Sequence, residues 1–178
     1  MCDTSYSRTT CFLSDRRYCT GKKELAKTGR KLHVIHQTGA KDAEWVKDAY
    51  AAADIPARVN AFEYEMGRAM ATADVVVARA GASTCFELAL TGSPAFLIPL
   101  PSAMRNHQHY NAAAFAARLA AAEGTQNELT PGALSKWLFY KAVHADSLLE
   151  MVRNMKSMSV PDAASRVADL VERIARER

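Results

Sequence analysis

The sequence has no long apolar run and few cysteines, and each shortage argues against a class of protein. No stretch of the 178 residues approaches the ~20 apolar residues that a membrane-spanning helix needs. Residues 1–23 lack the central apolar segment of a signal peptide, so we expect no signal peptide. The cysteines match neither zinc-site nor disulfide spacings, and this favours a reducing, cytoplasmic compartment: Cys2, Cys11, Cys19 and Cys85.

Most of the chain also lacks an excess of charge of either sign. The net charge is +4, but residues 1–31 hold eight Lys and Arg against three Asp and Glu, whereas residues 32–178 hold fifteen against sixteen. The basic excess lies in the leading segment, and we expect no nucleic-acid partner. Residues 1–23 show no periodicity either, so we predict an atypical, irregular leader; contact with anionic lipid is the alternative.

Motifs for nucleophilic or metal chemistry are absent as well. The sequence contains no His-Glu-x-x-His, no Gly-x-Ser-x-Gly and no Walker sequence. We therefore predict no nucleophile, no metal site and no cofactor.

Short β-branched runs alternate with helical patterns from residue 31 onward. The predicted strands, which we expect to be central, lie at 32–36, 57–61, 74–78 and 94–99. The predicted helices lie at 40–53, 65–73, 83–91, 107–121, 131–141 and 143–158, with a last amphipathic helix after 159. This alternation predicts an α/β domain over 24–178, with a Rossmann-like parallel sheet sandwiched by helices.

A turn of small residues follows the strand at 74–78 and opens the next helix. Its residues are Gly81, Ala82, Ser83 and Thr84. Small side chains let backbone N–H groups approach a ligand, and the helix N-terminus adds partial positive charge, so this turn suits a diphosphate. Glu87, one turn later, can accept both hydroxyls of a ribose. The alternative is a simple capped turn with Glu87 as a surface charge.

A second polar cluster follows the strand at 94–99. After Pro99 and Pro101, residues 105–111 form a continuous polar and aromatic run, which is either an exposed loop or one that faces a ligand. His107 in this run can serve as an acid or base, although hydrogen bonding or capping is the commoner role of a lone histidine in such a loop.

Several motifs in the same order resemble the donor-binding domain of the MurG family. They are VIHQTG (34–39), FEYEM (62–66), RAGASTCFE (79–87), PAFLIPLP (94–101), HQ-x-x-N-A (107–112) and the closing helix at 159–176. The resemblance covers about residues 24–178. It implies the C-terminal half of a GT-B glycosyltransferase, which transfers N-acetylglucosamine from its UDP donor to undecaprenyl-pyrophosphoryl-N-acetylmuramyl-pentapeptide in peptidoglycan synthesis.

The same resemblance assigns roles to individual residues. The family's backbone contact to uracil falls on Glu63, its ribose carboxylate on Glu87, and its sugar contacts on His107 and Gln108. Its diphosphate-binding turn falls on Gly81, Ala82, Ser83 and Thr84. The partners implied are UDP-N-acetylglucosamine and, through an acceptor-binding domain, the lipid-linked acceptor at the inner face of the plasma membrane.

The leading segment departs from the family pattern. Members carry a strand and a Gly-Gly-Ser-Gln-Gly-Ala loop before VIHQTG, and residues 1–23 contain no such loop. The acceptor-binding domain has no counterpart in the sequence either, so we expect the chain to be inactive without one. The alternatives are a non-catalytic UDP-sugar-binding subunit of a split glycosyltransferase, a fragment without function, or part of a related UDP-sugar glycolipid synthase.

Overall fold

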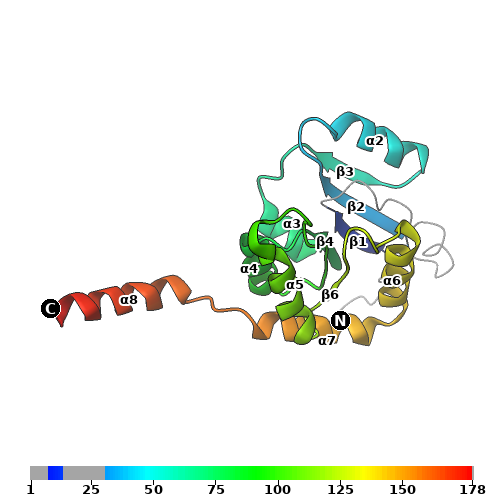
Figure 1. Cartoon of the computed structure of the whole chain (residues 1–178). Coiled ribbons are helices and arrows are strands. Elements are labelled where there is room, and N and C mark those ends of the chain that lie inside the picture. Colours follow the sequence, from blue (N-terminus) through cyan, green and yellow to red (C-terminus); the bar gives the residue numbers. More distant parts are fainter. Residues whose placement is uncertain (1–7, 14–30, 178) are drawn as a thin grey trace, which may run out of the picture.

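A parallel sheet forms the centre of the molecule (Figure 1). The structure, a computed structural model, describes residues 8–13 and 31–177. Six strands pair in parallel in the order β3-β2-β1-β4-β5-β6. They are β1 (Arg8–Leu13), β2 (Lys31–Gln37), β3 (Ala57–Asn60), β4 (Val75–Ala78), β5 (Ala95–Leu97) and β6 (Ala121–Glu123). The predicted parallel sheet is confirmed.

Helices cover both faces of the sheet. They are α2 (Ala43–Ala52), α3 (Met66–Thr72), α4 (Ala82–Thr91), the short 3-10 helix η2 (Met104–Asn106), α5 (His107–Ala117), α6 (Pro131–Val143), α7 (Ala145–Ser157) and α8 (Ala163–Arg176). One core cluster joins α3, α4, α5 and α7 to one face, and a second joins α2 and α6 to the other. The predicted three-layer α/β fold is confirmed.

Strand β4 shows why the sheet is covered on both sides. Side chains of a strand point alternately to opposite faces. Val76 and Ala78 belong to the first core cluster, whereas Val75 and Val77 belong to the second. All four are buried, so neither face of β4 reaches solvent.

The leading segment contains a strand that was not predicted. β1 pairs with β2 over Arg8–Leu13 and with β4 over Cys11–Leu13, so it lies in the middle of the sheet. The expectation of an irregular leader was therefore wrong for residues 8–13. The physical reason is that β2 and β4 each have backbone N–H and C=O groups to pair on their facing sides, and the backbone of residues 8–13 pairs with both. Residues 1–7 and 14–23, and the predicted domain boundary after residue 23, lie outside the described residues.

Two further expectations need correction at the edges of the sheet. The run at 57–61 was expected to be central, but β3 pairs only with β2 among the described strands. The helix expected over 107–121 ends at Ala117, and Leu119 adopts a left-handed φ of 54° before β6 begins. An alanine-rich segment therefore changes from helix to strand, because β5 leaves an edge that residues 121–123 pair with.

The predicted helix boundaries are confirmed where the sequence carries capping residues. The Thr130 hydroxyl accepts a hydrogen bond from the Ala133 N–H at 3.1 Å, and Pro131 is the first residue of α6. Gly92 ends α4 in the left-handed conformation with φ of 72°. No helix in the described ranges has the length and hydrophobicity to cross a membrane.

We expect Gly92→Ala to destabilise the fold. A left-handed backbone costs a residue with a Cβ about 1–2 kcal/mol, and a Cβ at this position would lie 2.6 Å from Cγ and Cε of Lys156. Urea unfolding should therefore show a loss of at least that size. Gly67→Ala is the matched control, because Gly67 lies in α3, where an added Cβ would meet no atom within 4 Å, and it should gain about 0.5–1 kcal/mol. Equal effects of the two substitutions would contradict this account.

Candidate functional site

The N-terminus of α4 presents backbone N–H groups at the carboxyl end of β4. Gly81 precedes the helix with φ of −65° and ψ of 150°. The first hydrogen bond of the helix runs from the Cys85 N–H to the Gly81 carbonyl at 2.9 Å. The N–H groups of Ala82, Ser83 and Thr84 therefore precede that bond, and no side-chain cap is formed there. These donors and the helix dipole favour an anion.

Two side chains on α4 differ in their exposure to solvent. Glu87 is exposed, so its carboxylate is accessible to a ligand near the start of the helix. Cys85 is buried in the core, and burial raises the pKa of its thiol to about 11. A thiol held in its neutral form is not a nucleophile, so Cys85 acts as a small side chain of the core.

The start of α5 lies beside this turn and carries three polar side chains with defined partners. His107 Nδ1 lies 2.8 Å from the Met104 carbonyl. Gln108 Oε1 accepts a hydrogen bond from the Leu100 N–H at 3.0 Å. Asn111 Nδ2 donates to the Ala80 carbonyl at 2.9 Å. The loop before the helix is tightly turned, since Arg105 and Asn106 have left-handed φ angles of 52° and 55°.

Glu63 lies in a polar network beyond β2 and β3. Its carboxylate is only 7% exposed and accepts hydrogen bonds from Arg58 Nη2 at 2.7 Å and Asn60 Nδ2 at 3.0 Å. Its backbone N–H donates to Gln37 Oε1 at 2.9 Å. A nucleobase that used this N–H would have to replace the Gln37 carboxamide, so Gln37 lies at the candidate site; its place there was not predicted from the sequence.

All predicted site residues lie at the same edge of the sheet. Because every strand is parallel, Glu63 follows the carboxyl end of β3, Gly81–Thr84 follow β4, and His107 and Gln108 follow β5. β2, to which Glu63 is bonded through Gln37, is two inter-strand spacings from β4, or ~10 Å. This span suits an extended nucleoside diphosphate, and ligands of α/β sheets bind at this edge.

Arg79, just after β4, also forms hydrogen bonds to the segments that follow β5 and β6. Arg79 Nη1 donates to the carbonyls of Ile98 and Pro99, both at 3.3 Å, and its Nη2 donates to Gln126 Oε1 at 2.7 Å. Neither these hydrogen bonds of Arg79 nor the hydrogen bond of Asn111 was predicted. The HQ-x-x-N-A motif does place Asn111 one turn after His107 and Gln108, and that spacing was the available signal.

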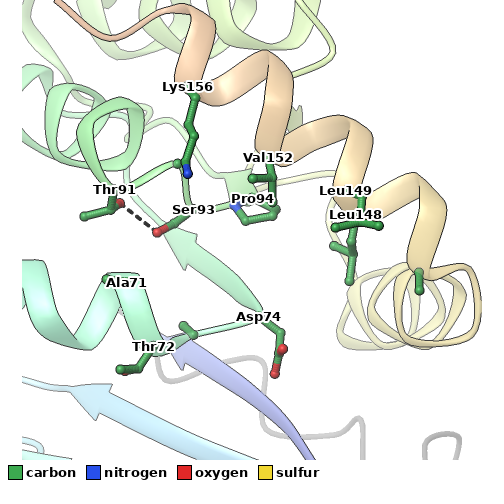
Figure 2. Close-up of a pocket in the computed structure, with 13 residues that line it drawn as sticks. Ala71, Thr72, Asp74, Thr91, Ser93, Pro94, Leu148, Leu149, Val152 and Lys156 are labelled. Carbon is green, nitrogen blue, oxygen red and sulfur yellow. Dashed lines mark hydrogen bonds between the residues drawn. The ribbon is translucent and has the colours of Figure 1, made fainter. Parts of the chain in front are cut away.

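A cavity of about 670 Å³ lies at the opposite, amino-terminal edge of the sheet, between α7 and the ends of α3 and α4 (Figure 2). Its hydroxyl groups are bonded within the chain: Ser93 Oγ donates to the Met70 carbonyl at 2.9 Å and lies 2.7 Å from Thr91 Oγ1. The Lys156 stem packs against Gly92 at the negative end of α4. Among the described residues, the lining includes one cation, Lys156, and one carboxylate, Asp74, beside the carboxyl-terminal end of α4, whereas the N–H groups that open α4 lie at the carboxyl edge.

Comparison with a family model identifies the domain. Residues 17–167 match the model described as the glycosyltransferase family 28 C-terminal domain. The chain belongs to this family. The match covers most of the described sheet and every predicted site residue.

Relatives of known name resemble the chain over less than half of their length. Two are UDP-N-acetylglucosamine–N-acetylmuramyl-(pentapeptide) pyrophosphoryl-undecaprenol N-acetylglucosamine transferases. The one from Aeromonas hydrophila is 38% identical over 151 residues, which is 85% of this chain and 42% of the relative. The one from Methylibium petroleiphilum is 41% identical over 155 residues, which is 86% of this chain and 42% of the relative.

Solved structures of two glycosyltransferases share the fold of this chain. MurG from Acinetobacter baumannii superposes with a TM-score of 0.77 at 28% identity, over 93% of this chain and 49% of that protein. The glycosyltransferase of kitacinnamycin, with a TM-score of 0.63 at 20% identity, shares the fold.

Within the described residues, no group of three or more His, Cys, Asp or Glu side chains is arranged to hold a metal ion.

We expect Arg58 to stabilise this family 28 domain through its bond to buried Glu63. Arg58→Ala leaves that carboxylate with fewer donors and should lower the free energy of unfolding in urea by about 1–2 kcal/mol. Arg68→Ala is the control, because Arg68 and its partner Glu65 are 79% and 65% exposed, and such a pair contributes less than about 1 kcal/mol. A loss as large for Arg68→Ala as for Arg58→Ala would contradict the role of burial.

Proposed function

We propose that this chain is the donor-binding half of an inverting glycosyltransferase. The reaction transfers N-acetylglucosamine from UDP-N-acetylglucosamine to undecaprenyl-pyrophosphoryl-N-acetylmuramyl-pentapeptide, the substrates named by its relatives. The observation that carries the proposal is the exposed start of α4 at the carboxyl end of β4, followed by the accessible Glu87. The proposal includes an acceptor-binding domain, carried by the same polypeptide or by another subunit.

The start of α4 suits the leaving group of this reaction. When an acceptor hydroxyl attacks the anomeric carbon, the bond to the diphosphate oxygen breaks and negative charge develops on UDP. The N–H groups of Ala82, Ser83 and Thr84, with the positive end of the helix, would stabilise that charge without reorganising. The hydroxyls of Ser83 and Thr84 supply two further donors. The acceptor proton would pass to a base in the acceptor-binding domain.

The remaining contacts follow from the order of strands. Glu87 would accept the two ribose hydroxyls. The Glu63 backbone would contact uracil after displacing Gln37 from its N–H. Gln108 Oε1 is held by the Leu100 N–H, so its NH₂ group, together with exposed His107, would face the sugar. Each end of the donor would thus meet a different loop of the carboxyl edge.

Helix α8 supports the need for a partner domain. It extends away from the sheet (Figure 1) and buries none of its residues. Its four large apolar side chains are between 44% and 60% exposed and share one helical face: Val167, Leu170, Val171 and Ile174. An amphipathic helix needs an apolar surface to cover such a face, and the acceptor-binding domain would provide it. Through that domain and its lipid-linked substrate, the enzyme would work peripherally at the inner face of the plasma membrane.

A second candidate is part of a related UDP-sugar glycolipid synthase, and a non-catalytic UDP-sugar-binding subunit of a split glycosyltransferase is a further alternative. The second candidate uses the same observation, because the exposed start of α4 and Glu87 would hold a UDP-sugar whichever acceptor is used. The glycolipid synthase differs from the first candidate in the acceptor used once an acceptor-binding domain is present. A test with the muramyl-pentapeptide lipid and with a diacylglycerol acceptor would separate them.

We expect Glu87→Ala to remove most of the affinity for UDP. A ribose held by two charge-assisted hydrogen bonds should lose roughly 2–3 kcal/mol, or about 30- to 150-fold in Kd, by calorimetric titration. Ser83→Ala should cost less, because the backbone donors remain. Glu44→Ala, which removes an exposed carboxylate in the first turn of α2, is the matched control and should bind UDP as the parent does. Unchanged binding by Glu87→Ala would disprove the ribose assignment.

We expect the purified chain alone to transfer no N-acetylglucosamine above background. The base, the lipid-facing surface and the closure that excludes water are all assigned to the acceptor-binding domain. Radiolabelled donor and lipid acceptor should give product only when a matching acceptor-binding domain is added. Turnover by the chain alone would refute the half-enzyme proposal and make His107 the first candidate for the base.

A further inference from the structure

Asn111 connects α5 to the peptide that opens the diphosphate-binding turn. Its side-chain amide donates to the Ala80 carbonyl at 2.9 Å, across 31 positions of sequence. That carbonyl and the Gly81 N–H belong to one peptide unit. A trans peptide is planar with the two groups pointing in opposite directions, and the described residues include no cis peptide bond. Fixing the carbonyl therefore fixes the direction of the Gly81 N–H.

The Gly81 N–H is directed away from Asn111 and has no acceptor among the described residues. It is thus one more donor next to those of Ala82, Ser83 and Thr84. Gly81 itself does not restrict the turn strongly, because glycine has wide backbone freedom. The orientation of this donor therefore depends on a contact from outside the turn, and Asn111 makes that contact.

The same helix also holds the exit of β5. Gln108 accepts from the Leu100 N–H three residues before Asn111 on α5. Two side-chain amides about one turn apart thus tie the loops after β4 and β5 to a single helix. A movement of α5 would change the phosphate end and the sugar end of the site together.

We propose that Asn111 is a positioning residue for the diphosphate of the donor. It orients the Ala80–Gly81 peptide so that the Gly81 N–H donates to a phosphate oxygen, and it keeps α5, with His107 and Gln108, at a fixed place relative to the start of α4. This inference rests on the proposed function, since it assigns a diphosphate to the turn.

The test compares UDP with uridine, which lacks the phosphates. In Asn111→Ala and in Asn111→Asp, which keeps the shape but has no N–H donor, calorimetric titration of the full chain should show UDP binding about fivefold weaker and uridine binding unchanged. Asn154→Ala is the matched control, because Asn154 Nδ2 donates to the Leu119 carbonyl at 3.4 Å, away from the site. It should leave both ligands unchanged. A general structural role for Asn111 would weaken both ligands equally and overturn the proposal.

A ligand-free measurement separates this inference from the proposed function. The Gly81 amide resonance, observed by ¹⁵N NMR, should shift and broaden in Asn111→Ala and Asn111→Asp but not in Asn154→Ala. If the parent chain bound neither UDP nor uridine, the proposed donor site would fail, and the Gly81 resonance would still decide whether Asn111 orients the turn. An unchanged Gly81 resonance, or UDP binding equal to that of the parent, would overturn the positioning role.

Discussion

Burial of β4 on both faces is the constraint on which the site depends. A strand with no solvent-facing side must have helices above and below it, and parallel neighbours connected by those helices satisfy this need. Val76 and Val77 are fully buried, on opposite faces. The chain leaves β4 at the carboxyl edge and must turn at once into α4, so the turn at Gly81 and the start of the helix are brought to the same edge as the loops after β2, β3 and β5.

Much of this arrangement could be predicted from sequence, and the exceptions have physical reasons. Helices such as α4 and α6 follow from apolar periodicity and from the caps at Gly92 and Thr130. β6 could not be predicted, because alanine favours helix, and only the edge of β5 makes a strand of residues 121–123. β1 was not predicted because its six residues lie among basic and polar residues and show no apolar periodicity. Its place in the sheet is set by pairing with β2 and β4, which are distant in sequence.

The site was predictable in part for the same reasons. Gly81 and Glu87 are close in sequence, so local pattern and family resemblance both pointed to them. Gln37 and Asn111 act through bonds that span 26 and 31 positions, and no local pattern contains such information. The network around Glu63 was predictable only in part. Arg58 and Asn60 share a face of β3, because they are two positions apart, but the buried Glu63 carboxylate to which they donate comes after the strand ends.

Each of α2, α3, α4 and α5 follows a parallel strand, so each begins at the carboxyl edge and ends at the amino-terminal edge. Their peptide dipoles therefore share one direction, and the domain is electrically polar along its strands although residues 32–178 carry nearly balanced side-chain charge. At the far end of α4, the Lys156 stem over Gly92 brings a cationic side chain to the negative terminus. The attraction for an anion is consequently a property of the main chain, and exchange of surface residues leaves it in place. The turn Gly81–Thr84, which we propose to bind the diphosphate, accordingly consists of small uncharged residues and carries no basic side chain.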